Sequence, residues 1–303
     1  MLCVAGATVR GLSHATTNMP NQDAIVRFVH DGDRPLAMVA VADGHGAGRH
    51  FRSSIGAALA VNAFASTALT TVFFDPEVNP ERIAAVFAAA LVNRWTTGVA
   101  DYHLTYPFTR AEQTYAAQRG EAGAFRSVLL TPLLAYGTTV LGTVVTPSHI
   151  VHVQIGDGDI IEVGQDGNVR RMFEVPWPIL GEETDSLCME DVATRVRVEA
   201  SSRSTREFRL IMVSTDGYSK SFKTDQGFRQ VASDLITMIA EHGIGHVERH
   251  MRDWLSEATS GGSGDDVTCG VIAQLPDAPP SEPSAIEQSE AQCSVVDVAA
   301  RSS

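Results

Sequence analysis

Three acidic blocks, each at the edge of an apolar run, constrain this chain more than any other feature. They are MVAVADGHG with Asp43, LIMVSTDG with Asp216, and GSGDDVTCGVIAQL with Asp265 and Asp266. A carboxylate at the end of a buried strand is costly to desolvate unless a positive charge lies beside it. One Asp-Gly pair alone is typical of an ordinary turn. Three such blocks together favour a single cleft, in which bound cations relieve the repulsion between the carboxylates.

The donor atoms of these blocks indicate which cation would bind. An all-oxygen ligand set favours the hard ions Mg²⁺ and Mn²⁺ over Zn²⁺, which prefers Cys and His. The four cysteines are far apart and contain no CxxC pair that would indicate zinc. We therefore expect reduced thiols.

Length allows one large domain or two small ones, and motifs that run from near residue 11 to near residue 274 favour one catalytic domain over residues 1–275. The chain has 303 residues and 44% hydrophobic content, which is ample for a core. Its net charge is −13 and it has no long block of Lys and Arg, so nucleic acid is not an expected partner. The N-terminus does not read as a leader, and no run of about 18 apolar residues is seen. We expect a cytoplasmic protein that does not bind membranes.

Periodicity predicts an antiparallel meander with helices between its parts. We expect strands at 2–9 and 24–29 and before Asp43, then long helices over 47–70 and from Glu81. Residues 103–134 have no clean periodicity and receive no assignment. From Tyr136 the alternation typical of strands returns, and Gln165 to Asn168 predicts a hairpin.

The C-terminal half is predicted to contain further strands and helices of the domain, followed by a disordered tail. Residues 166–200, rich in Pro and acidic groups from 174 onward, favour a flap-like surface excursion. A strand ending at Asp216, helices near 226–241 and 246–258, and a strand from Val267 follow. Residues 276–303, rich in Pro, Ser, Glu, Ala and Gln, predict a disordered tail.

Five segments, in order, resemble the metal-dependent protein phosphatases of the type 2C family, particularly the bacterial members. They are GLSHATTNMPNQDA (11–24), VADGHG (41–46), YGTTVLGTVV (136–145), VQIGDGDI (153–160), and VSTDGYS (213–219) with GDDVT (264–268). DGHG alone would be a weak signal, whereas five segments in sequence are a specific one. The resemblance implies an α+β fold, a four-layer αββα sandwich in which antiparallel helices flank two packed antiparallel β-sheets.

The resemblance also implies a reaction and a ligand set. Two Mn²⁺ or Mg²⁺ ions would activate a bridging water or hydroxide to hydrolyse phosphoserine or phosphothreonine in a protein substrate. Asp43 would bridge the ions, the Gly44 carbonyl would bind one of them, and Asp216 and Asp265 would complete the other. A cognate serine/threonine kinase is a further expected partner.

Three more roles follow from the resemblance, each with a plainer alternative. Asp23 would hold metal-bound water, or else cap a turn. Asp157 would bind a third, weaker ion, or else sit in a hairpin. His45 would protonate the departing oxygen, since its ordinary pKa near 6.5 suits an acid, although a lone histidine is more often structural. Thr138 and Thr139 are predicted to be structural, packing or hydrogen-bonding next to the site.

The sequence differs from many family members in the residues expected to bind the substrate phosphate. Many members of the family carry an Arg before the NQD-type segment, and residues 13–20 contain none. His14 and Asn18 are the candidates for substrate binding in its place. The missing Arg favours one alternative, a catalytically weak phosphoprotein-binding regulatory module of the same fold. A small-molecule phosphomonoesterase is a second alternative, which the flap region could decide.

Overall fold

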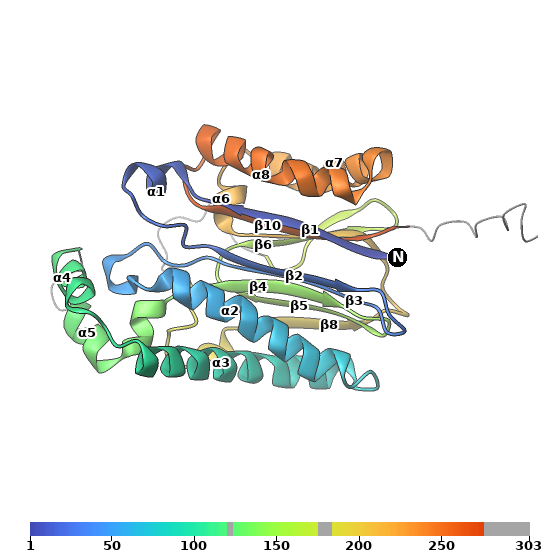
Figure 1. Cartoon of the computed structure of the whole chain (residues 1–303). Helices are drawn as coiled ribbons and strands as arrows, with labels where there is room; N and C mark the ends of the chain where they lie inside the picture. The colour runs from blue at the N-terminus through green and yellow to red at the C-terminus, as the bar shows by residue number, and fades with distance from the viewer. Residues whose placement is uncertain (120–123, 175–183, 276–303) are drawn as a thin grey trace, which may run out of the picture.

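Two antiparallel five-stranded sheets lie face to face at the centre of the molecule (Figure 1). The computed structural model describes residues 1–119, 124–174 and 184–275. The first sheet contains, in spatial order, β1 (Leu2–Val9), β10 (Val267–Gln274), β9 (Phe208–Ser214), β6 (Asp159–Gly164) and β7 (Val169–Arg171). The second contains β2 (Ala24–His30), β3 (Leu36–Ala42), β4 (Val140–Val145), β5 (His149–Ile155) and β8 (Arg197–Ser202).

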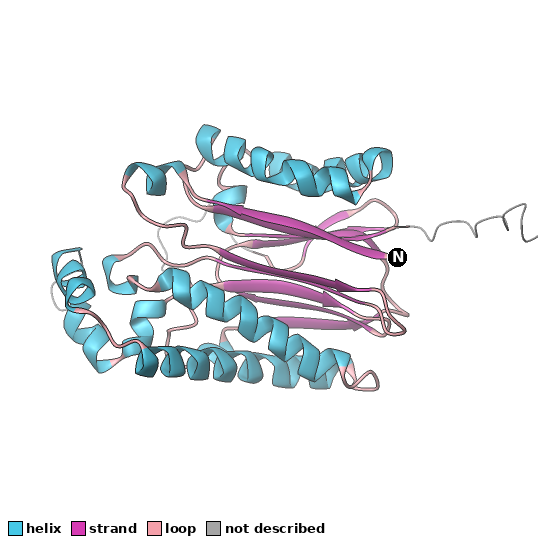
Figure 2. Cartoon of the chain, in the orientation of Figure 1, coloured by secondary structure: helices cyan, strands magenta, loops and turns pink. Residues whose placement is uncertain are grey.

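Long antiparallel helices cover the outer face of each sheet (Figure 2). Helices α2 (Ser53–Ala68) and α3 (Pro80–Thr105) lie on the second sheet, and α7 (Asp225–His242) and α8 (Ile244–Gly261) lie on the first. The predicted α+β four-layer αββα sandwich is therefore confirmed. The remaining α-helices of the described residues are short: α1 (Leu12–Thr16), α4 (Arg110–Arg119), α5 (Ala124–Leu130) and α6 (Asp216–Ser219). Short 3₁₀ or π turns complete the helical elements: η1 (Gly48–His50), η2 (Leu69–Phe73), η3 (Pro132–Tyr136) and η4 (Val192–Thr194).

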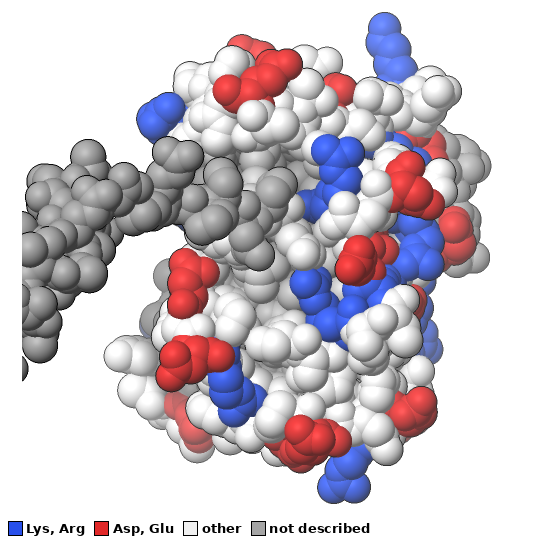
Figure 3. Space-filling model, turned by 90° about the vertical axis from the view of Figure 1, so that its right-hand side faces the viewer, with Lys and Arg blue, Asp and Glu red and all other residues white. Residues whose placement is uncertain are grey.

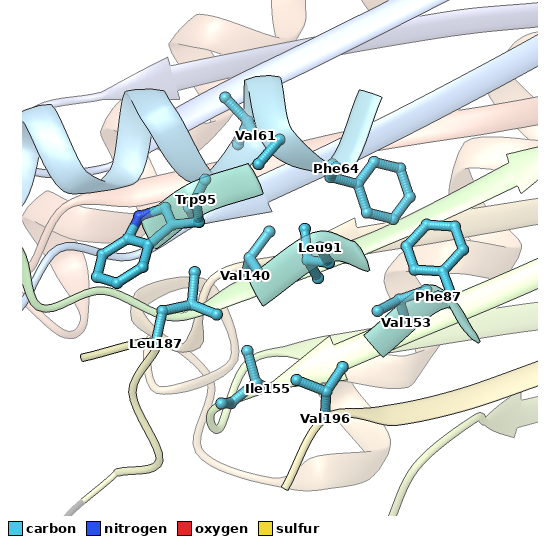
Figure 4. Close-up of a cluster of buried hydrophobic side chains, with 14 of the residues drawn as sticks. Val61, Phe64, Phe87, Leu91, Trp95, Val140, Val153, Ile155, Leu187 and Val196 are labelled. Atoms are coloured by element: carbon cyan, nitrogen blue, oxygen red, sulfur yellow. The ribbon is translucent and has the colours of Figure 1, made fainter. Parts of the chain in front are cut away.

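Helix α3 shows how local sequence sets an element and its packing. The Asn79 side chain accepts from the Arg82 N–H at 2.8 Å, and Pro80 follows at the first helical position, so the start of the helix is well defined. Apolar side chains four residues apart then form one buried face, comprising Ile83, Phe87, Leu91, Trp95 and Val99. This face packs with α2 and the outer surface of the second sheet (Figure 4).

A separate apolar layer fills the space between the sheets. Val39 and Val41 of β3, Leu141 of β4, and Ile211 and Val213 of β9 belong to it, and each is fully buried. Because β3 is covered on both faces, all seven of its residues are buried and its sequence shows no alternation.

Residues 103–134, which received no assignment from the sequence, contain α4, α5 and η3 in addition to the end of α3. Helix α4 is held by a buried ion pair more than by an apolar face. Arg52, 5% exposed, donates from Nε to Glu112 Oε1 at 2.6 Å. Arg52 also donates to the Tyr136 hydroxyl at 2.7 Å. Such an ion pair leaves no periodic pattern in the sequence.

The prediction of a surface excursion over 166–200 is wrong for part of that range. Gly167 makes the predicted hairpin turn with φ of 82°, and β7 then pairs with β6. Leu187, Val192 and Val196 are buried in the core beneath α3. Residues 175–183 lie outside the described residues, as does the tail predicted for 276–303.

Two segments are long and apolar enough to cross a membrane by length and composition, Ser53–Phe73 and Pro80–Thr105. This differs from the expectation drawn from the sequence, because Ser, Thr and Asn interrupt the apolar runs without adding charge. In the fold these segments form the helix pair that covers the second sheet, and core helices share the same composition.

Charges of both signs are interspersed on the face opposite α1 and α6. Figure 3 views this face, where described Lys and Arg side chains alternate with Asp and Glu. The acidic cluster described next lies at the other end of the sheets.

Candidate active site

The predicted acidic residues meet at one end of the sheet pair, beside α1 and α6 (Figure 1). Asp43 follows the last residue of β3, and Asp23 precedes β2, its antiparallel partner. In the other sheet, Asp216 follows β9 and Asp265 precedes β10, which are also antiparallel. In an antiparallel pair the end of one strand lies beside the start of the next. Asp157 joins them from the β5–β6 loop.

Asp43 and Asp216 connect the two sheets directly. Their carboxyl groups are close enough to share a hydrogen bond. Burial, followed by the charges of Asp23, Asp216 and Asp265, raises the pKa of Asp43 well above its usual range. Burial also raises the pKa of Asp216, but the neighbouring Lys220 ammonium outweighs it and holds that pKa below its usual value. The cluster therefore contains more carboxylates than the neighbouring Lys220 ammonium can neutralise, and this excess of negative charge favours the binding of cations.

Asp23 is anchored through one oxygen and open at the other. Its Oδ2 accepts from the hydroxyls of Thr215 at 2.8 Å and Thr268 at 2.7 Å. Its Oδ1 is buried and has no hydrogen-bond partner within the described part of the chain. A buried carboxylate oxygen without a partner is costly, so this atom suits a water held by a bound ion.

The adjacent residues Asp265 and Asp266 differ sharply in environment. The Asp265 side chain is 48% exposed and burial raises its pKa, whereas the Asp266 side chain is 3% exposed. Asp266 accepts from the backbone N–H groups of Gly11 and Gln22, each at 2.6 Å. It also contacts Nδ1 of His14 at 2.8 Å. Asp266 thus fixes the N-terminal segment over the site, and Asp265 faces the opening.

The Asp43–Gly44 backbone is fixed by two threonines that lie between η3 and β4. Thr138 donates from its hydroxyl to the Asp43 carbonyl at 2.8 Å, and the Thr139 hydroxyl accepts from the Asp43 N–H at 3.0 Å. Gly44 forms a single bridge with Thr138. The prediction that Thr138 and Thr139 are structural residues next to the site is confirmed, with hydrogen-bonding as their role.

His45 lies beside the carboxylates with its ring close to that of His50, at a centroid distance of 5.1 Å. Burial, together with His50 and Arg49, lowers the pKa of His45 to about 4, against a smaller raising effect from Asp216. Its Nε2 is buried and makes no hydrogen bond to any described group. The imidazole is therefore neutral near pH 7 in this structure, unlike the ordinary histidine that the sequence suggested.

The two candidate substrate-binding residues lie in different settings. His14, in α1, is held by Asp266, and its Nε2 lies 3.9 Å from Asp265 Oδ1, so it belongs to the acidic cluster. Asn18 is exposed in the loop after α1 and has a left-handed φ of 56°, a conformation that Asn tolerates better than most residues.

The oxygen ligands of the acidic cluster fit hard divalent cations, although in this structure they are not yet arranged around a single ion position. The five aspartates and the Gly44 carbonyl supply only oxygen ligands, and Asp23 Oδ1 is open. In the described residues, no three His, Cys, Asp or Glu side chains already surround one ion position.

Sequence reasoning missed the residues that position the carboxylates. Thr215 and Thr268 stand inside the recognised segments STDG and DDVT, so their place next to a strand-end Asp was the available signal. Lys220 stands four residues after Asp216, the spacing at which side chains on a helix meet. Asp159, at the start of β6, forms a buried ion pair with Arg171 at 2.7 Å.

The comparison with protein families gives the class of protein to which this fold belongs. The model of the family "Protein phosphatase 2C" matches residues 10–256. This chain belongs to that family, and by class it is a phosphoprotein phosphatase. No curated protein sequence matches it.

Solved structures share the fold at low sequence identity. The catalytic domain of the serine/threonine protein phosphatase PstP, in complex with two manganese ions, is 16% identical with a TM-score of 0.53, and the match covers 90% of this chain and 97% of that one. The phosphatase Stp1 from Staphylococcus aureus is 15% identical with a TM-score of 0.55, over 91% and 96%. The serine/threonine phosphatase of S. agalactiae is 12% identical with a TM-score of 0.55, over 91% and 100%. At these identities the likeness concerns the fold.

Proposed function

We propose that this chain is a Mn²⁺- or Mg²⁺-dependent serine/threonine protein phosphatase. The observation that carries the proposal is the meeting of Asp43 and Asp216 from opposite sheets, with Asp23 and Asp265 beside them. Two ions would be held by Asp43, the Gly44 carbonyl, Asp216 and Asp265. Such ions, when bound, supply charge that neutralises the phosphoryl oxygens and lowers the pKa of the attacking water.

The residues of the chain have separate tasks in this proposal. Asp23, fixed by Thr215 and Thr268, orients a water through its open Oδ1. His45 is the proton donor to the departing serine or threonine oxygen, and its Nε2 is buried and makes no hydrogen bond to any described group. A protonated histidine with a pKa near 4 gives up its proton more readily than an ordinary imidazolium, but the His45 imidazole is neutral near pH 7, so substrate binding must supply the proton or raise that pKa.

Substrate phosphate would be held without the Arg that many relatives carry. His14 and Asn18 are the proposed contacts, because α1 and the loop after it border the acidic cluster. The proposed substrates are phosphorylated proteins, with a serine/threonine kinase as the opposing enzyme. A cytoplasmic location is part of the proposal, since Cys3, Cys188 and Cys269 are free thiols.

The second candidate function is a catalytically weak phosphoprotein-binding module. The missing Arg and the contact of Lys220 with Asp216 favour it. A module of this kind would bind phosphopeptides without turnover, and Asp216→Ala would leave that binding intact.

The test compares substrates and one variant. Hydrolysis of a phosphothreonine peptide, a phosphoserine peptide and free phosphorylated metabolites is measured with Mn²⁺, beside Asp216→Ala with its fold checked by circular dichroism. We expect peptide turnover that falls at least about 10²-fold in the variant, because metal stabilisation is worth several kcal/mol. Preference for metabolites would indicate a small-molecule phosphomonoesterase, and peptide binding without turnover would indicate the regulatory module.

A further inference from the structure

Lys220 carries a positive charge into the acidic cluster from within the chain. It follows α6 directly, and its ammonium forms an ion pair with Oδ2 of Asp216, four residues earlier. The same nitrogen lies 4.0 Å from Oδ2 of Asp157. Asp157 and Asp216 are themselves close enough to share a hydrogen bond. One ammonium group therefore lies between two carboxylates, one from the β5–β6 loop and one that follows β9.

The surroundings hold this arrangement in place. The Lys220 N–H donates to the Asp216 carbonyl at 2.8 Å, so the lysine stem starts one helical turn from its partner. On the other side, the Thr184 hydroxyl donates to Asp157 Oδ2 at 2.9 Å. The Asp157 and Asp216 side chains are only 13% and 7% exposed, while that of Lys220 is 46% exposed. The Lys220 side chain therefore lies on the solvent side of the two buried carboxylates, and its ammonium separates them from solvent.

We propose that Lys220 takes the cation position between Asp157 and Asp216, so that this protein binds two metal ions and excludes a third. Asp157 is the residue that resemblance assigned to a third ion, and the ammonium already contacts both carboxylates that such an ion would need. A divalent ion placed there would lie against the ammonium and be repelled at short range. The inference rests on the proposed two-metal function, because Asp216 would be a ligand of the two-metal site and also borders the position that Lys220 occupies.

Lysine is a suitable permanent cation for this position. Its ammonium is a compact charge with three donors, so it can contact two carboxylates at once. Because it is tethered to α6, it does not dissociate at low metal concentration. Positive charge beside Asp157 is therefore independent of the metal supply.

The stoichiometry of Mn²⁺ binding tests the proposal without reference to turnover. Equilibrium dialysis of the full chain counts ions per molecule for the unaltered protein, for Lys220→Met, which keeps the length and removes the charge, and for Lys220→Arg, which keeps the charge. Lys223→Met is the matched control, because Lys223 is an exposed lysine three residues away. Thermal unfolding checks that each variant is folded.

We expect two ions in the unaltered protein, in Lys220→Arg and in Lys223→Met, and three ions in Lys220→Met. Adding Asp157→Asn to Lys220→Met should return the count to two, which places the gained ion at Asp157. Three ions in the unaltered protein, or no gain in folded Lys220→Met, would overturn the inference while leaving the two-metal proposal standing. A protein that binds no Mn²⁺ would instead overturn the proposed function, and this inference with it.

Discussion

The hydroxyl of Thr268 donates a 2.7 Å hydrogen bond to Oδ2 of Asp23, 245 residues earlier in the chain. Thr268 belongs to β10 of one sheet, and Asp23 directly precedes β2 of the other. The Thr215 hydroxyl donates to the same oxygen. These contacts join the two sheets at the end where the acidic residues meet, and the other carboxyl oxygen, Asp23 Oδ1, is without a partner among the described groups.

Removal of that hydroxyl should weaken metal binding more than folding. Thr268→Val keeps the shape and the β-branched character of the side chain. We expect Mn²⁺ affinity to fall by about 10- to 100-fold, the usual effect of losing a residue that orients a ligand. Calorimetric titration with Mn²⁺ measures it. Thr237→Val is the control, since Thr237 is exposed and its hydroxyl contacts only its own helix. Equal affinities in both variants would show that the orientation of Asp23 does not matter.

Substitutions of the adjacent residues Asp265 and Asp266 should have different effects, one on metal binding and the other on stability. Asp266→Ala leaves the buried N–H groups of Gly11 and Gln22 without an acceptor, so we expect a loss of about 3 kcal/mol of unfolding free energy. Asp265→Ala should change stability by only about 0.5 kcal/mol, as is usual at exposed positions, while it weakens Mn²⁺ binding. Urea denaturation of both variants measures this difference. Similar losses of stability in the two would contradict the assignment.

A pair of helix glycines provides a test of the packing around the site. A Cβ on Gly56, in α2, would lie 1.9 Å from the Tyr136 carbonyl oxygen, which is backbone and cannot easily move. We expect Gly56→Ala to cost about 3 kcal/mol through overpacking. A Cβ on Gly98, in α3, would meet only Leu59 Cδ2 at 3.6 Å, so Gly98→Ala should stabilise by about 0.5 to 1 kcal/mol. Thermal unfolding of the two variants measures these changes in stability. A Gly56→Ala variant as stable as the unaltered protein would mean that α2 and η3 are not in close contact.

The Arg52–Glu112 ion pair should make stability depend on pH below neutrality. Burial raises the pKa of Glu112, but hydrogen bonds from Arg52 and Thr109 outweigh it and lower that pKa to about 2, from 4.5. A depressed carboxyl pKa stabilises the fold above the unfolded value and loses that effect as pH falls through the folded value. The contribution is therefore full above pH 4.5 and lost by about pH 2. We expect about 2 kcal/mol at pH 7, allowing for partial screening.

Glu112→Gln measures this contribution directly. The difference in unfolding free energy between the two proteins should be constant above about pH 5 and shrink as pH falls toward 2. Glu257→Gln, an exposed substitution on α8, serves as the control and should show little difference at any pH. A difference for Glu112→Gln that does not vary with pH would show that the ion pair does not control the titration.

The strand-end aspartates could be predicted because their chemistry is local. An Asp that follows an apolar run must be compensated, and antiparallel pairing places such ends side by side. Asp43, Asp216 and Asp265 therefore meet as the sequence suggested. The long helices were predicted for the same kind of reason, since the buried face of α3 repeats every four residues.

What escaped prediction depends on contacts between distant segments. Helix α4 is held through Arg52 and Glu112, 60 residues apart, and leaves no periodic signal. Leu187 and Val192 fill space under α3 although apolar and charged residues alternate irregularly around them in the sequence. The pKa of His45 depends on burial and on His50 and Arg49, and this setting becomes visible only in three dimensions.

The most direct test of the account is turnover of a phosphothreonine peptide in EDTA, after addition of Mn²⁺ or Mg²⁺, and after a second addition of EDTA. The account predicts no turnover in EDTA, turnover with metal, and its loss on chelation, with Asp43→Asn at least about 10²-fold slower although folded. Turnover that persists in EDTA, or a folded protein inactive with both metals, would contradict it.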